Sequence, residues 1–168
     1  DKTAKSAAQY ERVAEIPFDS KRKCMSVVVK NSGGEYFLMT KGGADVVLAK
    51  ATHYIENGKI KRLDSITRKR FQNQNEIMAS KALRVLAAAY KKISVQDAEK
   101  VRVLKGKSGN VENTLIFVGF AGLMDPPREE VPNAVKMCAE AGIRTIMITG
   151  DHKVTAAAIA KEVNISGN

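Results

Sequence analysis

A chain of 168 residues allows one ordinary domain, or one domain and part of a second, with enough length to bury a core. Apolar residues at 44% and charged residues at 27% exclude a disordered chain, and no apolar run approaches the roughly 20 residues that span a bilayer. The net charge of +10 leaves nucleotides, nucleic acid, an anionic membrane surface or a merely solvated basic surface open.

The first part of the chain is predicted to form antiparallel strands. The β-branched run at 24–30 and the run at 35–40 flank Asn-Ser-Gly-Gly, which is typical of a hairpin. A short helix is expected at 44–51. The Asn57-Gly58 pair indicates another turn between short strands.

Longer elements follow. Residues 64–81 contain neither glycine nor proline and predict a helix that begins at Asp64 or Ser65. Apolar runs at 83–90 and 115–124 predict buried strands. The basic, polar run at 100–113 between them predicts a surface loop.

The pattern changes at Asp125-Pro-Pro-Arg128, because two prolines fix φ and remove two hydrogen-bond donors. A helix beginning at Val131, a strand at 144–149 and a helix ending at Val163 are expected next, which is the order of a parallel α/β unit. We therefore place a domain boundary here, dividing the chain into 1–124 and 125–168.

Cysteine and histidine give no indication of a metal site. Cys24 and Cys138 lie far apart without Cys-x-x-Cys spacing, and His53 and His152 have no paired ligand pattern. We expect no metal ligands, no disulfide framework and a reducing compartment.

An aromatic residue followed by cations is the first candidate binding stretch. Phe18 precedes Asp-Ser-Lys-Arg-Lys23, and such a ring can stack on a nucleobase for about 1–3 kcal/mol while a cation meets phosphates. The alternative is a core phenylalanine beside a solvated basic turn.

Three further stretches are candidates. Lys41 precedes Gly42 and Gly43, which allow a backbone to approach a ligand closely, although a plain strand-to-helix turn has the same pattern. Arg84 opens an apolar strand and could meet a buried anion or form an internal salt bridge. Thr149-Gly150-Asp151 lies between a predicted strand and helix, where α/β sheets bind ligands and where ordinary helix caps also lie.

These stretches, in this order, resemble the type II P-type (E1-E2) cation-transporting ATPases, and most of all their bacterial calcium-transporting members. The resemblance covers residues 10–163, and its last two motifs are the most specific. The segments that carry it are IPFDSKRKCM at 16–25, KGGA at 41–44, LRVL at 83–86, MDPPR at 124–128 and MITGD at 147–151.

The resemblance implies a nucleotide pocket. Phe18 would stack on adenine, Lys23 would face the phosphates, Lys41 and Gly42 would line the deep end, and Arg84 would bind phosphates or ribose. The chain departs from the family where Gly43, Ala44 and Asp45 replace Ala-Pro-Glu, and where Ser20 replaces a common arginine.

The resemblance also assigns residues outside the pocket. Asp125 and Arg128 would belong to the hinge between two domains. Thr149 would hold the transferred phosphoryl group, with Asp151 beside it. The phosphorylated aspartate and the magnesium loop are absent from this sequence, so the chain is expected to be a fragment that is inactive alone.

The implied fold is α+β, an antiparallel sheet flanked by helices, followed by a partial haloacid-dehalogenase-like α/β segment. The module would bind ATP or ADP, with Mg²⁺ in the parent enzyme, and position ATP for phosphoryl transfer to an aspartate elsewhere. Its partners would be the remaining phosphorylation, actuator and membrane domains of one pump. It would be a cytoplasmic domain of a membrane protein, neither bound to nucleic acid nor inserted in the membrane.

Two other functions fit parts of the sequence. The charge would suit a nucleic-acid-binding module, but aromatic residues are only 5% of the chain, which disfavours a stacking platform for single strands. A soluble dehalogenase-type phosphatase would need its own nucleophilic aspartate. No Asp-x-Asp or Asp-x-Thr ends an apolar strand in this sequence.

Overall fold

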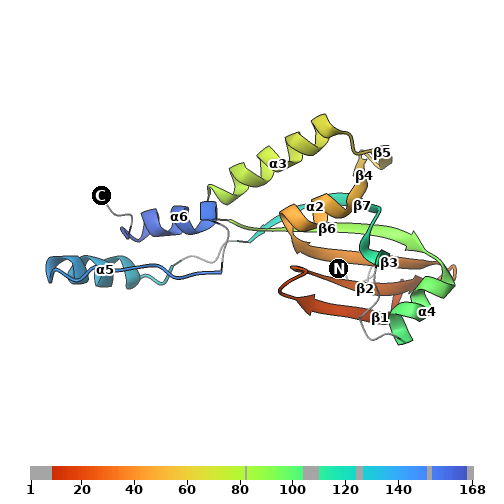
Figure 1. The fold of residues 1–168 in the computed structure, drawn as a ribbon, viewed down its shortest axis with the longest axis horizontal. Helices are drawn as coiled ribbons and strands as arrows, with labels where there is room; N and C mark the ends of the chain where they lie inside the picture. Colours follow the sequence, from red (N-terminus) through yellow and green to blue (C-terminus); the bar gives the residue numbers. More distant parts are fainter. Residues whose placement is uncertain (1–8, 82, 104–109, 124–126, 151–152, 166–168) are drawn as a thin grey trace. The chain divides into compact units, whose positions relative to one another are not determined.

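The computed structural model describes residues 9–81, 83–103, 110–123, 127–150 and 153–165 (Figure 1). Seven strands form one sheet with the order β1-β2-β3-β6-β7-β4-β5. The strands are β1 (Tyr10–Asp19), β2 (Cys24–Asn31), β3 (Tyr36–Gly43), β4 (Ala51–Glu56), β5 (Lys59–Arg62), β6 (Arg84–Ile93) and β7 (Leu115–Leu123). The helices are α2 (Ala44–Lys50), α3 (Ser65–Ala79), α4 (Val95–Val103), η1 (Asn110–Glu112), α5 (Val131–Glu140) and α6 (Lys153–Glu162).

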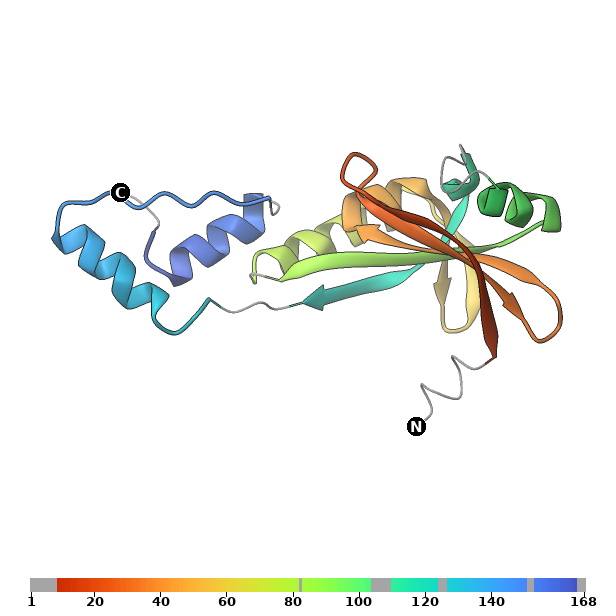
Figure 2. The ribbon, with the colours of Figure 1, turned by 90° about the horizontal axis from the view of Figure 1, so that it is seen from below.

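The predicted hairpin is confirmed. Strands β2 and β3 pair antiparallel from Cys24↔Gly42 to Lys30↔Tyr36, and β1, β2 and β3 lie side by side in both views (Figure 1 and Figure 2). The second turn is also confirmed. Asn57 and Gly58 have φ of 52° and 74°, the left-handed values that a tight two-residue hairpin turn needs.

The sheet is mixed rather than wholly antiparallel. β4 and β7 pair in parallel, with Tyr54 opposite Phe117, whereas the other recorded pairs are antiparallel. Parallel neighbours need a long crossover. Here α3, β6 and α4 all lie between β4 and β7 in the chain. The expectation of an antiparallel sheet is therefore correct only for most of its pairs.

One face of the sheet carries the core. Cys24, Ser26 and Val28 alternate along β2 and are buried, as are Leu38 and Thr40 opposite them on β3. Helix α2 packs beside β3 and α4 lies against β1 (Figure 1), burying Val47, Leu48, Ala98 and Val101.

The strands at 84–93 and 115–123 are less buried than the sequence predicts. On β6, Ala87 and Ala89 are buried, whereas Arg84 and Ala88 are exposed. Only Leu115 and Phe117 are buried on β7. Small and apolar residues on both faces of a strand hide the alternation that a one-sided core imposes.

The predicted loop at 100–113 was wrong at both ends. Residues up to Val103 belong to α4, whose N-terminus is capped by Ser94: its Oγ accepts a hydrogen bond from the Asp97 amide at 3.1 Å. At the other end Glu112 is buried in η1. The stretch between, 104–109, lies outside the described residues.

The chain divides into two compact units, Asp1–Lys69 with Leu86–Ala121, and Arg70–Val85 with Gly122–Asn168. In the second unit α5 and α6 form as predicted, but 144–149 is not a strand. Ile146 and Ile148 are 71% and 94% exposed. A strand needs a neighbour for its ladder, and none pairs with these residues in the described part of the chain. A haloacid-dehalogenase-like segment is thus not confirmed.

No helix of the described residues combines the length and apolarity that a membrane crossing requires.

Candidate functional site

The outer face of the sheet, opposite the core, brings two of the predicted residues into one row. Met25 pairs with Lys41, and Lys41 pairs with Ala88. Opposite Met25, a bulge in β1 between Ile16 and Asp19 leaves two residues, Pro17 and Phe18. We call Phe18, Met25, Lys41 and Ala88 the outer row.

Three of the four side chains of the outer row are open to solvent. Phe18 is 63% exposed, which contradicts the alternative that it is a core residue. Lys41 and Ala88 are exposed and Met25 is half-buried. Met39, on the same face of β3, is 36% exposed. An exposed ring beside apolar side chains and a cation suits a flat, anionic ligand.

Lys23 ends the turn that follows Phe18. It adopts φ of 51°, a left-handed conformation that costs a non-glycine residue about 1–2 kcal/mol. The turn holds this shape through its backbone. The amide of Lys23 donates to the Asp19 carbonyl at 2.7 Å, and the carbonyl of Lys23 accepts from the Gly43 amide at 2.9 Å. The Lys23 side chain is exposed.

Gly42 has a packing role within the protein. A Cβ at this position would lie 2.4 Å from the Lys23 carbonyl oxygen and 2.6 Å from Cys24 Cα. These are backbone atoms that cannot move aside cheaply. The glycine therefore lets β3 approach the end of the turn closely. The Lys-Gly-Gly pattern fits either the approach of a ligand or a plain strand-to-helix turn, and at Gly42 the atoms approached belong to the protein's own turn.

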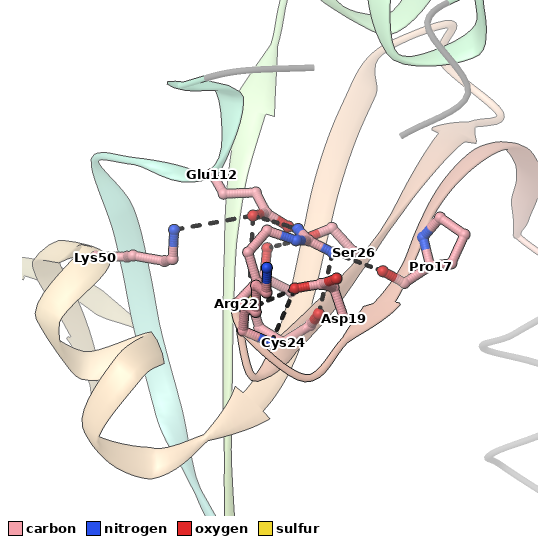
Figure 3. Close-up of polar contacts among 9 residues, drawn as sticks. Pro17, Asp19, Arg22, Cys24, Ser26, Lys50 and Glu112 are labelled. Carbon is pink, nitrogen blue, oxygen red and sulfur yellow. Dashed lines mark hydrogen bonds and ion pairs between the residues drawn. The ribbon is translucent and has the colours of Figure 1, made fainter. Parts of the chain in front are cut away.

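A buried carboxylate, that of Glu112, lies beside this turn on the core side of the sheet (Figure 3). Glu112 is 5% exposed, and both its oxygens accept from one Arg22 nitrogen at 2.6 Å. Ser26 Oγ donates to Glu112 at 2.6 Å and also contacts Thr40 Oγ1 at 2.8 Å. Lys50 Nζ lies 3.8 Å from the same carboxylate.

These contacts keep Glu112 ionised. Burial pushes its pKa up, but hydrogen bonds from Arg22 and Ser26, together with the charges of Arg22 and Lys50, outweigh burial and lower the pKa. Burial, and then the Glu112 charge, raises the pKa of the Cys24 thiol, whose Sγ lies 3.8 Å from the carboxylate. The thiol is protonated and structural rather than reactive.

Sequence reasoning missed Glu112 and treated Arg22 only as part of a basic cluster. The two residues are separated by 90 positions, so no local spacing joins them. The available signal was weak: Glu112 is an acidic residue in a polar stretch just before the apolar run of β7.

The remaining predicted residues lie in the second unit. Arg84 is exposed at the start of β6, and Arg128 is exposed ahead of α5, with its carbonyl accepting from the Val131 amide. Thr149 is exposed in the irregular stretch before α6. Asp125 and Asp151 lie outside the described residues.

Comparison with known proteins agrees with the family resemblance seen in the sequence. Residues 1–130 match the family model described as "P-type ATPase, cytoplasmic domain N". The chain is 43% identical over 157 residues to calcium-transporting ATPase 1 of Bacillus cereus, covering 94% of this chain and 17% of that protein. It is 42% identical over 154 residues to calcium-transporting ATPase 1 of Lactococcus lactis, covering 92% and 17%.

A calcium-transporting ATPase of Bacillus subtilis is 36% identical over 158 residues, again 94% of this chain and 17% of that protein. The chain thus spans about a sixth of the length of these curated relatives. Because the family model covers well over half of the chain, the chain belongs to the family of P-type ATPase cytoplasmic N domains.

Proposed function

We propose that the outer row is an ATP-binding surface, and that the chain positions ATP for phosphoryl transfer to an aspartate outside it. The observation that carries the proposal is the 63% exposure of Phe18 in one cross-strand row with Lys41. An aromatic ring left in water at the end of a strand gains free energy when a base stacks on it.

Two exposed lysines lie near Phe18 in the sheet and in the chain. Lys41 lies across Met25 in the outer row, and Lys23 ends the turn that begins just after Phe18. Adenine stacked on Phe18 would leave the triphosphate to these two lysines. Their long, mobile stems reach a phosphate without a fixed geometry.

The affinity expected from one ring and a few exposed cations is modest. We expect dissociation constants from high micromolar to millimolar, on the order of −4 to −6 kcal/mol. Each exposed cation contributes little because water and salt screen it.

The rest of the assignment extends this proposal. Gly42 shapes the turn that carries Lys23, and Arg84 binds phosphates or ribose. Residues 1–124 form the nucleotide-binding domain, and 125–168 form the hinge, with Asp125 and Arg128, and part of the phosphorylation domain. There Thr149 and Asp151 serve the phosphoryl site.

The parent protein is proposed to be a calcium-transporting pump that uses ATP with Mg²⁺, and its other domains are the partners of this one. Within the described residues, no group of three His, Cys, Asp or Glu side chains could hold a metal ion.

A titration followed by NMR tests the surface. ATP added to ¹⁵N-labelled chain should shift the amides around Phe18, Lys23 and Lys41 together, with one dissociation constant. Inorganic triphosphate should shift the lysine amides but leave those of the Phe18 strand nearly unchanged. Perturbation by ATP of only the basic stretch at 100–110 would contradict the proposal.

A further inference from the structure

The turn between β1 and β2 is tied to a distant part of the chain through one arginine side chain. One terminal nitrogen of Arg22 donates to both oxygens of Glu112 at 2.6 Å. The other donates to the Pro17 carbonyl at 2.6 Å and to the Cys24 carbonyl at 3.2 Å. Pro17 and Cys24 flank the turn on its two sides, so one guanidinium joins both of its ends (Figure 3).

We call the contact of Arg22 with Glu112 the tether of this turn. Its carboxylate end, Glu112, is held in the core. Glu112 is 5% exposed, and Ser26 and Lys50, from β2 and α2, hold it in place. A buried, fully hydrogen-bonded carboxylate with two cations near it has one favourable position. The Arg22 side chain is 30% exposed and bridges this fixed point to the exposed turn.

The tether leads directly to the proposed ligand contacts. One terminal nitrogen of Arg22 donates to the carbonyls of both Pro17 and Cys24. Phe18 directly follows Pro17 in the chain, and Lys23 directly precedes Cys24. Asp19 also fixes the turn. Its Oδ1 accepts from the amides of Lys21 and Arg22 at 3.0 and 2.8 Å.

We propose that Glu112, acting through Arg22, is a positioning residue that sets Phe18 and Lys23 at the spacing that ATP requires. This inference rests on the proposed ATP-binding surface. Neither Glu112 nor Arg22 contacts the nucleotide in this account. Their effect on binding passes through the two ends of the turn, which they hold before the ligand arrives.

The two most informative variants separate the tether from the ion pair. Glu112→Gln removes a buried charge and can unfold the chain. Arg22→Lys keeps a cation for Glu112 but loses the fork that reaches Pro17 and Cys24. Glu35→Gln is the matched control for Glu112→Gln, because it also removes one carboxylate charge from a salt bridge, with Lys92, near Asn31 at the opposite end of β2.

The test is a double-mutant cycle measured by calorimetric titration with ATP on the 168-residue chain. Phe18→Ala alone should weaken binding about tenfold. Arg22→Lys alone should weaken it about threefold to tenfold, with an unchanged circular dichroism spectrum. In the Arg22→Lys background, Phe18→Ala should cost less than about threefold, because the ring is already out of place. Glu35→Gln should leave the affinity for ATP unchanged.

A merely structural role for Arg22 gives a different result. If Arg22→Lys only lowered the folded fraction, Phe18→Ala would cost the same tenfold in both backgrounds. That outcome overturns the positioning role and leaves the ATP surface standing. If Phe18→Ala has no effect in the parent chain, the ATP surface fails, and the positioning role fails with it.

Discussion

The turns at the two ends of β2 are built in different ways. The turn from Asn31 to Glu35 closes through its own residues. The Gly34 amide donates to the Asn31 carbonyl, and the Glu35 amide donates to Asn31 Oδ1. From a more distant part of the chain, Lys92 of β6 adds an exposed ion pair with Glu35. The turn from Asp19 to Lys23 is held by a buried carboxylate from 90 residues away.

The difference indicates which turn must hold its side chains in fixed positions. A turn that only reverses the chain needs glycine and local hydrogen bonds, and the sequence Ser-Gly-Gly supplies them. The turn that carries Phe18 and Lys23 contains no glycine, places a lysine at φ of 51°, and is fixed from the core. Strain supported by buried contacts is a feature of sites where side chains must be held for a ligand.

The largest expected effect comes from breaking the buried pair. Glu112→Gln should lower the free energy of unfolding by about 3 kcal/mol, because it leaves Arg22 partly buried without its counter-ion. Glu35→Gln, at the other turn, should change it by less than about 0.5 kcal/mol, since its pair is exposed and screened. Urea unfolding followed by circular dichroism measures both. Equal effects of the two substitutions would contradict the contrast between the turns.

A smaller effect is expected where β3 approaches the first turn. Gly42→Ala should destabilise by about 1–3 kcal/mol, because its Cβ would overlap backbone atoms of Lys23 and Cys24. Gly43→Ala is the matched control, since its Cβ would lie 3.1 Å from the Asp45 side-chain oxygen and at an ordinary contact distance of 3.8 Å from the Lys23 Cβ and carbonyl oxygen. Thermal melting of both variants compares them, and a Gly42→Ala variant as stable as Gly43→Ala would show that the close approach is not required.

The smallest expected difference between the two turns lies in how the free energy of unfolding depends on pH in acid. The pKa of Glu112 is held below its ordinary value of 4.5 by Arg22, Ser26 and Lys50 against the opposing effect of burial. Its contribution to stability is therefore complete above pH 4.5 and is lost as the pH falls below that value through the lower pKa of the folded state.

The pKa of Glu35 is also lowered, by hydrogen bonds from Lys92 and then Asn31, but Glu35 is exposed. Stability measured from pH 6 to pH 3 should consequently depend less on pH in Glu112→Gln than in Glu35→Gln, especially at high salt, which screens only the exposed pair. The same slope in both variants would contradict the assigned pKa shift.

Elements coded by neighbouring residues could be predicted from the sequence. The hairpin of β2 and β3, the Asn57-Gly58 turn and the start of α3 after Asp64 all depend on turn or cap residues within a few positions. Asp64 Oδ1 accepts from the Thr67 amide at 2.7 Å, which is the helix cap that the sequence indicated.

Features that depend on distant residues could not be predicted. Arg22 and Glu112 meet only after the 90 positions between them have folded. The parallel pairing of β4 with β7 depends on the order of all the strands in the sheet. The strand expected at 144–149 has the right apolar pattern but no neighbouring strand among the described residues. The apolar pattern of a segment indicates which of its residues can be buried. Whether they are buried depends on a neighbouring strand or helix that packs against them.

The candidate ligand residues could be predicted only in part. Their types and a family resemblance single out Phe18, Lys23 and Lys41 in the sequence, but that Phe18 and Lys41 share one cross-strand row follows only from the register of the sheet. Taken alone, the stretch around Phe18 fits a core phenylalanine beside a basic turn more readily than a ligand contact. The exposed fraction of 63% decides against the core position.

The most direct test of the ATP surface is to remove the ring of Phe18 without changing the net charge. Calorimetric titration with ATP should show that Phe18→Ala weakens binding about tenfold or more, the loss of about 1–3 kcal/mol of stacking, and that binding of inorganic triphosphate is nearly unchanged. Ile60→Ala, another exposed apolar residue, and Lys59→Ala, which removes a charge, both on β5, should leave ATP binding within about twofold. A folded Phe18→Ala variant that binds ATP as tightly as the parent chain, while Lys59→Ala does not, would contradict the account and assign the binding to charge alone.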